Sequence, residues 1–215
     1  ELVSHEFFHV WNVKRIRPKP LGPFDYRSEN HTRQLWTMEG VTSYYEKRFV
    51  AAAGLYPKER FLERVADEIA SLQAQPGRAL QSLQQSSFDA WIRHYRPDEN
   101  SGNVSISYYQ KGALVALMLD LEIRALTSRA KCLDDVVKHL AHQATLDDTG
   151  FAEPDGYLDA VDAVAGEQGG AFKTFFERFV SGTVELDYER ALAHAGLSLA
   201  WTCSGVKEGD LPGWL

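Results

Sequence analysis

Cysteine is nearly absent from this sequence, which has only Cys132 and Cys203 among its 215 residues. The two lie far apart and fit neither a Cys-x-x-Cys metal spacing nor a disulfide framework. Long apolar runs are absent as well, because charged side chains interrupt even the most apolar helical stretch, KGALVALMLDLEIRAL. No run approaches the roughly 18 apolar residues that a membrane-spanning helix requires. We therefore expect no dependence on disulfides and no membrane span.

Positive charge is also in short supply. The 23 Lys and Arg residues are outnumbered by 30 Asp and Glu, which gives a net charge of -7, and no basic stripe is present. A nucleic-acid partner is therefore not expected. Hydrophobic residues make up 44% of the sequence and charged residues 25%. These fractions are ordinary for a globular protein and argue against disorder.

The amino-terminal residues ELVSHEFFHVW contain neither a start methionine nor the basic-then-apolar layout of a signal peptide. They have the pattern of a helix that is already under way, so we expect the chain to begin inside a longer protein. A cytoplasmic location is slightly favoured, while periplasmic and secreted locations stay open. The oligomeric state is not indicated.

Apolar residues recur mostly at spacings of three and four, which predicts a mainly α fold. The expected helices span residues 1–12, 33–53, 57–75, 86–95, 104–128, 132–144, 155–165, 170–181 and 187–195. An irregular segment of about twenty residues with three prolines separates the first two helices, and ordered loops of that length are often functional.

The first helix carries His5-Glu6-x-x-His9. Residues four apart lie on one face of a helix, so the two imidazoles can bind a common cation. Glu6, one position round, would then lie beside the cation and could take a proton from a metal-bound water. The alternative is an amphipathic helix on which two ordinary histidines accompany Phe7 and Phe8.

A catalytic zinc ion normally has three protein ligands and one open position. Arg15 occupies the position six residues after His9 where a third histidine would lie, which leaves a glutamate on a later helix. Glu39 lies among apolar and aromatic residues in LWTMEGVTSYYEKRF, and a carboxylate on an apolar face needs a partner. Glu46 and Glu29 are the rivals, and we expect Glu46 to pair with a nearby Arg or Lys.

These segments together resemble a known family. HEFFHVWNVKRIRP and LWTMEGVTSYY are similar to the M61 zinc aminopeptidases, the glycyl aminopeptidase group of the gluzincins. SFDAWIRHYRPDENSGNVSISYYQKGALVALMLDLEIR and FFERFVSGTVELDYERALAHAGL extend the resemblance to about residue 197. The resemblance implies that residues 1–197 are the helical lobe of a thermolysin-like catalytic domain. The non-helical tail, 198–215, would then be a possible start of a following PDZ-like module.

By this resemblance His5, His9 and Glu39 are the ligands of one zinc ion per chain, and Glu6 is the general base. The implied activity is zinc-dependent hydrolysis of peptides, with removal of small amino-terminal residues such as glycine or alanine. A gluzincin endopeptidase with the same zinc site is one alternative. A catalytically incomplete family member that binds peptides is another.

A tyrosine is the expected donor to the oxyanion. The related M1 aminopeptidases have a Tyr-x-Lys-Gly element, which reads Tyr109-Gln-Lys-Gly112 here and nominates Tyr109. A phenol can stabilise a developing oxyanion in a dry site. Without the resemblance, a core aromatic residue would be the preferred interpretation of Tyr109, and Tyr108 is the second choice of donor.

Accessory residues follow from the same segments. Arg15 and Arg17 are expected to make structural ion pairs, with contact to a substrate carboxylate or carbonyl as the alternative. Asn12 and Asp25 are candidates for orienting the histidines, since ligating histidines usually donate their other N–H to an oxygen. The remaining histidines lack paired spacing with an acid and are interpreted as ordinary: His31, His94, His139, His142 and His194.

Overall fold

The structure, a computed structural model, describes residues 1–147 and 149–202. Within these residues it is mainly helical, as predicted, and β structure is limited to two isolated bridges, Asn12–Ile16 and Pro18–Phe151. No described helix is long and apolar enough to cross a membrane. Cys203 and most of the predicted tail, 198–215, lie outside the described residues.

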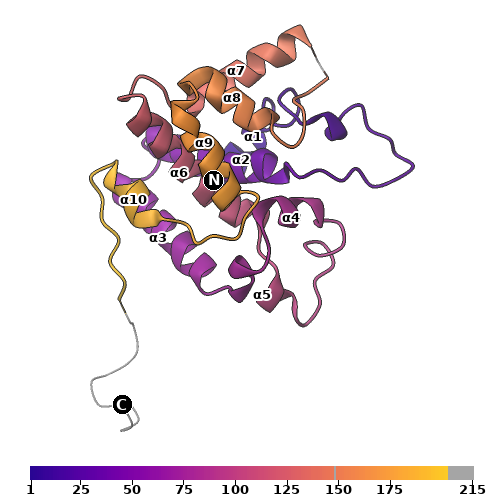
Figure 1. Cartoon of the computed structure of the whole chain (residues 1–215). Helices are drawn as coiled ribbons and strands as arrows, with labels where there is room; N and C mark the ends of the chain where they lie inside the picture. Colours follow the sequence, from indigo (N-terminus) through magenta and orange to yellow (C-terminus); the bar gives the residue numbers. More distant parts are fainter. Residues whose placement is uncertain (148, 203–215) are drawn as a thin grey trace.

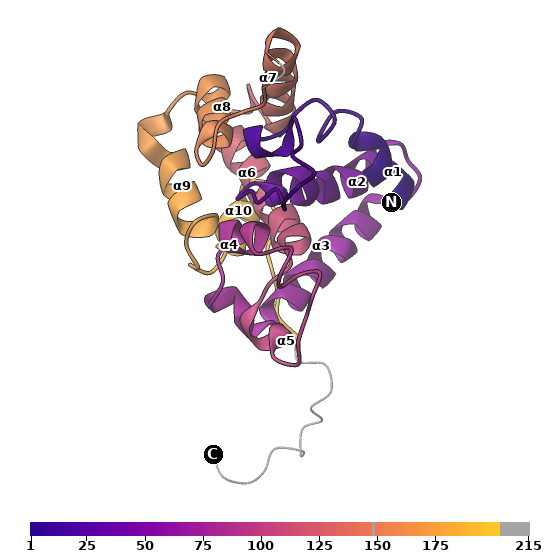
Figure 2. The same ribbon diagram turned by 90° about the vertical axis from the view of Figure 1, so that its right-hand side faces the viewer.

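Ten α-helices follow one another along the described chain. They are α1 Leu2–Phe8, α2 Val41–Ala52, α3 Lys58–Gln73, α4 Leu83–Phe88, α5 Ser101–Val104, α6 Tyr108–Leu126, α7 Leu133–Leu146, α8 Gly156–Ala165, α9 Ala171–Phe179 and α10 Tyr188–Ala193. Three 3₁₀ turns, η1 Lys19–Leu21, η3 Pro76–Ala79 and η4 Gln168–Gly170, and one π-helix, η2 Trp36–Gly40, complete the order. Figure 1 labels the helices along the chain, and Figure 2 shows α6 in the middle of the bundle, with α1 and α2 on one side and α8 and α9 on the other.

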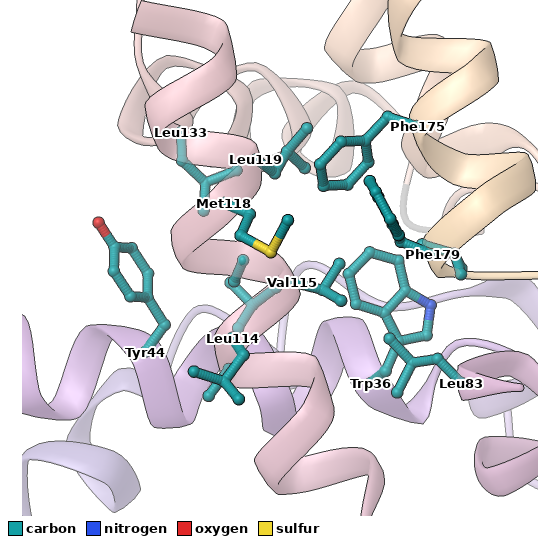
Figure 3. Packing of buried hydrophobic residues seen from close by; sticks show 14 of the residues in the cluster. Trp36, Tyr44, Leu83, Leu114, Val115, Met118, Leu119, Leu133, Phe175 and Phe179 are labelled. Atoms are coloured by element: carbon teal, nitrogen blue, oxygen red, sulfur yellow. The ribbon is translucent and has the colours of Figure 1, made fainter. Parts of the chain in front are cut away.

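Helix α6 forms the centre of the core. Its 19 residues include apolar side chains that are buried around the whole helix, which is typical of a helix enclosed by neighbours. Figure 3 shows Val115 and Met118 of α6 beside the rings of Trp36, Phe175 and Phe179. Helix α6 therefore packs against η2, α2 and α9.

Two glycines let α6 and η2 touch. A Cβ atom on Gly40 would lie 2.5 Å from the Cα atom of Gly112 and 2.9 Å from the carbonyl oxygen of Tyr108. No side chain fits there, so the two backbones pack directly. Glu39 immediately precedes one glycine and Tyr109 lies three residues before the other. The close crossing therefore brings these two predicted site residues near each other.

The predicted helix at 86–95 is wrong. The helix in this region, α4, begins at Leu83, because Ser82 and Gln85 form a capping box: the Ser82 hydroxyl accepts from the Gln85 N–H at 3.2 Å, and the Gln85 side chain accepts from the Ser82 N–H at 3.0 Å. The helix ends at Phe88, and the chain then continues in turns.

Two other predicted boundaries also differ. The first helix ends at Phe8 instead of residue 12, and a separate turn of helix, α5, precedes α6, which starts at Tyr108 and not at residue 104. The remaining expected helices agree with the structure to within three residues at each end. The proline-containing segment after α1 is irregular as expected, and backbone hydrogen bonds of 3.0 Å join it to Phe151.

Candidate metal centre

Three side chains meet where the end of α1 packs against η2. The Oε2 atom of Glu39 lies 3.1 Å from Nε2 of His5 and 3.2 Å from Nε2 of His9. The two imidazole rings are almost perpendicular, at 84°, with centroids 4.7 Å apart. Potential ligand atoms of all three residues lie within 4.8 Å of one another. The structure thus brings together the three residues that the sequence predicted as metal ligands.

The position of the two histidines follows from how α1 ends and packs. His9 is the C-cap residue and keeps helical backbone angles, and its N–H bonds to the carbonyl of His5, so both side chains stay on one face. Phe8 packs against Tyr45, with ring centroids 4.7 Å apart, and against Phe49 at 5.6 Å. These contacts fix α1 to α2, and His5 and His9 are thereby held beside the amino-terminal half of α2 and the preceding η2 turn.

Glu39 lies in a π-helix, Trp36–Gly40, that leads directly into α2. Single π turns of this kind are frequent at functional sites. The side-chain amide of Asn12 donates to the carbonyls of Thr37 at 2.8 Å and Met38 at 3.2 Å and to the Thr42 hydroxyl at 3.1 Å. Asn12 thereby ties the end of α1 to the turn that carries Glu39.

The outer nitrogens of both imidazoles are occupied. Nδ1 of His5 lies 2.7 Å from Oε2 of Glu46, and Nδ1 of His9 lies 2.7 Å from the backbone carbonyl oxygen of Asn12. A carbonyl and an ionised carboxylate only accept hydrogen bonds, so each Nδ1 carries a proton, and a neutral ring then has a bare Nε2. Two bare nitrogens and the Glu39 carboxylate consequently face one another. Three acceptors in such an arrangement require a cation, either a proton or a metal ion.

The electrostatics of the cluster favour positive charge. Burial opposes ionisation of Glu39, but the hydrogen bonds and charges of His9 and then His5 outweigh it and lower the pKa of that carboxyl. The hydrogen bond to Glu39 raises the pKa of His9, and burial opposes this, while the Asn12 carbonyl and the charges of Glu39 and Glu6 add to it. Glu6 itself is exposed beside the histidines.

Tyr109 lies against the same cluster from α6. Its ring stacks on His5, with an interplanar angle of 23° and centroids 6.3 Å apart. Burial, followed by the nearby charge of Glu39, raises the pKa of its hydroxyl. The hydroxyl therefore stays protonated at neutral pH, as a hydrogen-bond donor must. Tyr108, the second-choice donor, is only 1% exposed, and its hydroxyl lies 3.1 Å from that of Tyr95. The hydroxyls of Tyr95 and Tyr108 also affect the pKa of Tyr109, so the three phenols form one cluster.

The sequence profile of the M61 glycyl aminopeptidases matches residues 1–115 of this chain, which is more than half of its length. The chain belongs to the M61 family. The matched segment contains the three predicted ligands, Glu6 and Tyr109. The predicted resemblance is thereby confirmed.

A solved structure supports the same assignment. The crystal structure of an aminopeptidase N family protein from Idiomarina loihiensis is 32% identical to this M61 chain, with a TM-score of 0.83. The match covers 89% of this chain and 32% of that chain, so our M61 chain spans about a third of the length of that relative. A search of curated protein sequences found no match to the M61 chain described here. The predicted fold class, the helical part of an aminopeptidase-like structure, is confirmed by this likeness.

The contact between Glu46 and His5 is the feature of the M61 site that was not predicted from the sequence. Glu46 does bind a lysine as expected, with its Oε1 atom 3.2 Å from Nζ of Lys47, but its other oxygen is the one on His5. The available signal was spacing, because residues seven apart lie on one face of a helix and Glu46 follows Glu39 by seven. Asp25, predicted as an orienting group, instead binds Arg27 at 2.9 Å on the surface.

His94 also lies closer to the M61 site than expected. No spacing in the sequence distinguishes it from the other histidines, yet its ring stacks on Tyr109 with centroids 5.8 Å apart. Burial lowers the pKa of His94. Arg15 is exposed, and Arg17 donates to the carbonyl of Lys14 at 3.2 Å. Of the remaining histidines, His31 bonds to a backbone carbonyl, His194 contacts a glutamate, and His139 and His142 lie on α7.

Proposed function

We propose that His5, His9 and Glu39 bind one catalytic zinc ion and that the protein containing this chain hydrolyses peptide bonds, releasing amino-terminal residues. The observation that carries the proposal is the set of three converging acceptors, with both outer nitrogens already donated. Membership of the M61 family supports a peptidase and a peptide substrate. The family's description as glycyl aminopeptidases supports a preference for small residues such as glycine or alanine. The activity is proposed for the whole protein, since its solved relative is about three times as long as this chain.

The donor atoms suit zinc. Two imidazole nitrogens with one carboxylate oxygen form a common ligand set of catalytic zinc sites, which keep the fourth position open. Imidazole nitrogen binds zinc and other transition-metal ions such as copper, iron and nickel in preference to magnesium or calcium, which prefer oxygen ligands. The acceptors on the outer nitrogens, Glu46 and the Asn12 carbonyl, are the groups that usually orient zinc-binding histidines.

Five residues of this chain would then take part in the reaction: three metal ligands, a general base and a hydrogen-bond donor. His5, His9 and Glu39 hold the metal, which when bound supplies a Lewis acid that polarises the scissile carbonyl and acidifies water. Glu6, exposed next to the cluster, accepts a proton from the attacking water and returns it to the leaving amine. Tyr109 donates its hydroxyl proton in a hydrogen bond to the oxygen of the former carbonyl as negative charge develops there.

The experiment is a panel of peptides offered to the intact protein. Each peptide is made with a free and with an acetylated amino terminus, and products are identified by mass spectrometry. The aminopeptidase proposal predicts stepwise loss of residues from free termini and no cleavage of the acetylated set. Cleavage of acetylated peptides at internal bonds would show the endopeptidase alternative. Binding of peptides without cleavage would show a binding module.

A further inference from the structure

A row of three charged side chains, with a buried lysine in the middle, runs from His5 away from the proposed metal. It starts at Glu46 on α2, continues through Lys47, and ends at Glu68 on α3. Nζ of Lys47 lies 3.2 Å from Oε1 of Glu46 and 2.9 Å from Oε1 of Glu68. The charges alternate in sign along this row, and it joins a metal-binding histidine to a helix that carries none of the predicted ligands.

Lys47 is unusually well enclosed for a lysine. It is 5% exposed, and a buried ammonium is costly unless it is paired and fully hydrogen-bonded. Its third partner is the carbonyl of Ser43, one turn earlier on α2, at 2.8 Å. The three protons of the ammonium therefore have three acceptors. The Lys47 head group is therefore held between these three acceptors.

The position of Lys47 determines what Glu46 can do. Glu46 has one oxygen on Lys47 and the other on Nδ1 of His5, at 2.7 Å. While the first oxygen is held, the carboxylate cannot rotate away, so the second remains on the imidazole and fixes the plane of the ring. Glu68 and the Ser43 carbonyl in turn keep the ammonium from following Glu46 toward solvent.

We propose that Lys47 is a positioning residue of the metal centre, which holds Glu46 on His5 and so raises the affinity for the metal. The inference deepens the proposed function and rests on it, because it requires a metal at His5. Lys47 touches neither the metal position nor the substrate, so its effect is transmitted entirely through Glu46.

The test is a double-mutant cycle on zinc affinity in the intact protein, measured by competition with a chelator. Lys47→Met should release Glu46 from His5 and so weaken zinc binding by about tenfold, the low end of the effect of losing a group that orients a ligating histidine. Glu46→Gln should weaken it to a similar extent. The double variant should bind zinc with an affinity within about twofold of that of Glu46→Gln, because Lys47 affects the metal only through Glu46. Lys47→Arg should recover part of the affinity.

Lys111→Met is the matched control, since Lys111 is also a buried lysine, 2% exposed, but on α6. Its zinc affinity should equal that of the wild type. A purely structural role of Lys47 would lower the melting temperature of the metal-free protein and leave the zinc affinity of the folded protein unchanged. That result, or losses that simply add in the double variant, would overturn the proposal.

Glu68→Gln provides a second variant that keeps the lysine. If Lys47→Met does not fold, this variant decides the question. It should weaken zinc binding by about two- to fivefold, since only the outer anchor is lost, and wild-type affinity would overturn the proposal. Failure of the wild type to bind zinc at all would be a different result, because it would overturn the proposed function and the role of Lys47 with it.

Discussion

Glu39 and Glu122 each contact a histidine through Nε2, and the two carboxylates differ in how their charge is balanced. Glu122 on α6 has the guanidinium of Arg190 on one oxygen and Nε2 of His194 on the other, at 3.1 Å. A guanidinium is always charged, so this cluster is complete as an ion pair. Glu39 instead receives two imidazoles on a single oxygen.

The two histidines at Glu39 already donate their Nδ1 protons to other acceptors, and among the described residues no arginine or lysine pairs with that carboxylate. The same residue types therefore produce a closed structural contact at Glu122 and a site with a deficit of positive charge at Glu39. What separates a binding site from an ion pair here is whether a permanently charged guanidinium already balances the carboxylate.

The largest expected effect comes from Glu39→Gln. The change removes the only charged member of the acceptor set, so zinc affinity should fall by roughly 10²- to 10³-fold. This loss is a fraction of the binding free energy of a whole structural zinc site, which is about 10–16 kcal/mol. Peptide hydrolysis should drop to background. Chelator competition and a peptidase assay measure the two effects. Glu122→Gln is the matched control, and its zinc affinity should not change.

Glu6→Gln separates chemistry from metal binding. The amide cannot accept a proton from water, so kcat should fall by about 10²- to 10⁴-fold, the usual contribution of general acid–base catalysis. Zinc content should stay the same as in the wild type, since Glu6 is not among the proposed ligands. The exposed Glu29 offers a neutral control, because Glu29→Gln should leave kcat unchanged. Retained turnover in Glu6→Gln would refute the assigned role.

Tyr109→Phe tests the donor that α6 contributes to the Glu39 cluster. Loss of the hydroxyl should lower kcat by about 10²- to 10³-fold, as expected for one oxyanion donor, while KM changes little. The neighbouring Tyr108→Phe should instead lower the free energy of unfolding by about 1 kcal/mol, because it loses a buried hydrogen bond to Tyr95. If the two variants exchange these effects, Tyr108 is the donor.

Lys111 extends the comparison to a buried cation, and it yields a pH dependence. Burial lowers its pKa to about 8 from the ordinary 10.5, against the weaker opposing charge of Glu185. Between these two values the unfolded chain binds more protons than the folded one, so the contribution of Lys111 to stability rises with pH across that window. Lys111→Met should therefore be more stable than the wild type near pH 7 by about 3 kcal/mol, because a pKa difference of about 2.5, at about 1.4 kcal/mol for each unit, sets an upper limit of about 3.5 kcal/mol.

Denaturant unfolding at several pH values measures this difference. The advantage of Lys111→Met should shrink steadily as the pH rises through the window and should vanish above it. A difference that is the same at every pH would show that packing, and not the buried charge, causes the effect.

The smallest expected effect is that of Glu122→Gln on stability. The change breaks an ion pair whose arginine is 58% exposed, so solvent screening limits the loss of unfolding free energy to about 1 kcal/mol. Thermal unfolding of the metal-free protein measures it. A drop in zinc affinity in this variant would contradict the distinction drawn between the two glutamates.

Local sequence patterns were enough to predict those features of the site that depend on residue spacing within one helix. The spacing of His5 and His9 and the periodicity of the helices predicted which residues face one another, and the mainly helical fold is confirmed. The capping box at Ser82 was also visible in the sequence as Ser-x-x-Gln, and its neglect explains the misplaced helix at 86–95.

Contacts between elements could not be predicted in this way. The direct packing of Gly40 on Gly112 depends on how η2 crosses α6, and a glycine in a sequence does not indicate what approaches it. For the same reason the sequence placed Glu46 beside a lysine but did not show that its second oxygen would reach His5. The stacking of His94 on Tyr109 likewise joins a turn to a helix that follows it.

The central claim is that the three converging acceptors hold a zinc ion required for hydrolysis. Titrating zinc into the metal-free intact protein while following hydrolysis of a peptide with a free amino terminus tests it most directly. The account predicts that activity is absent at the start, rises in proportion to added zinc, and levels off at one zinc per chain. Full activity in the metal-free protein, or one tightly bound zinc per chain with no hydrolysis, would contradict it.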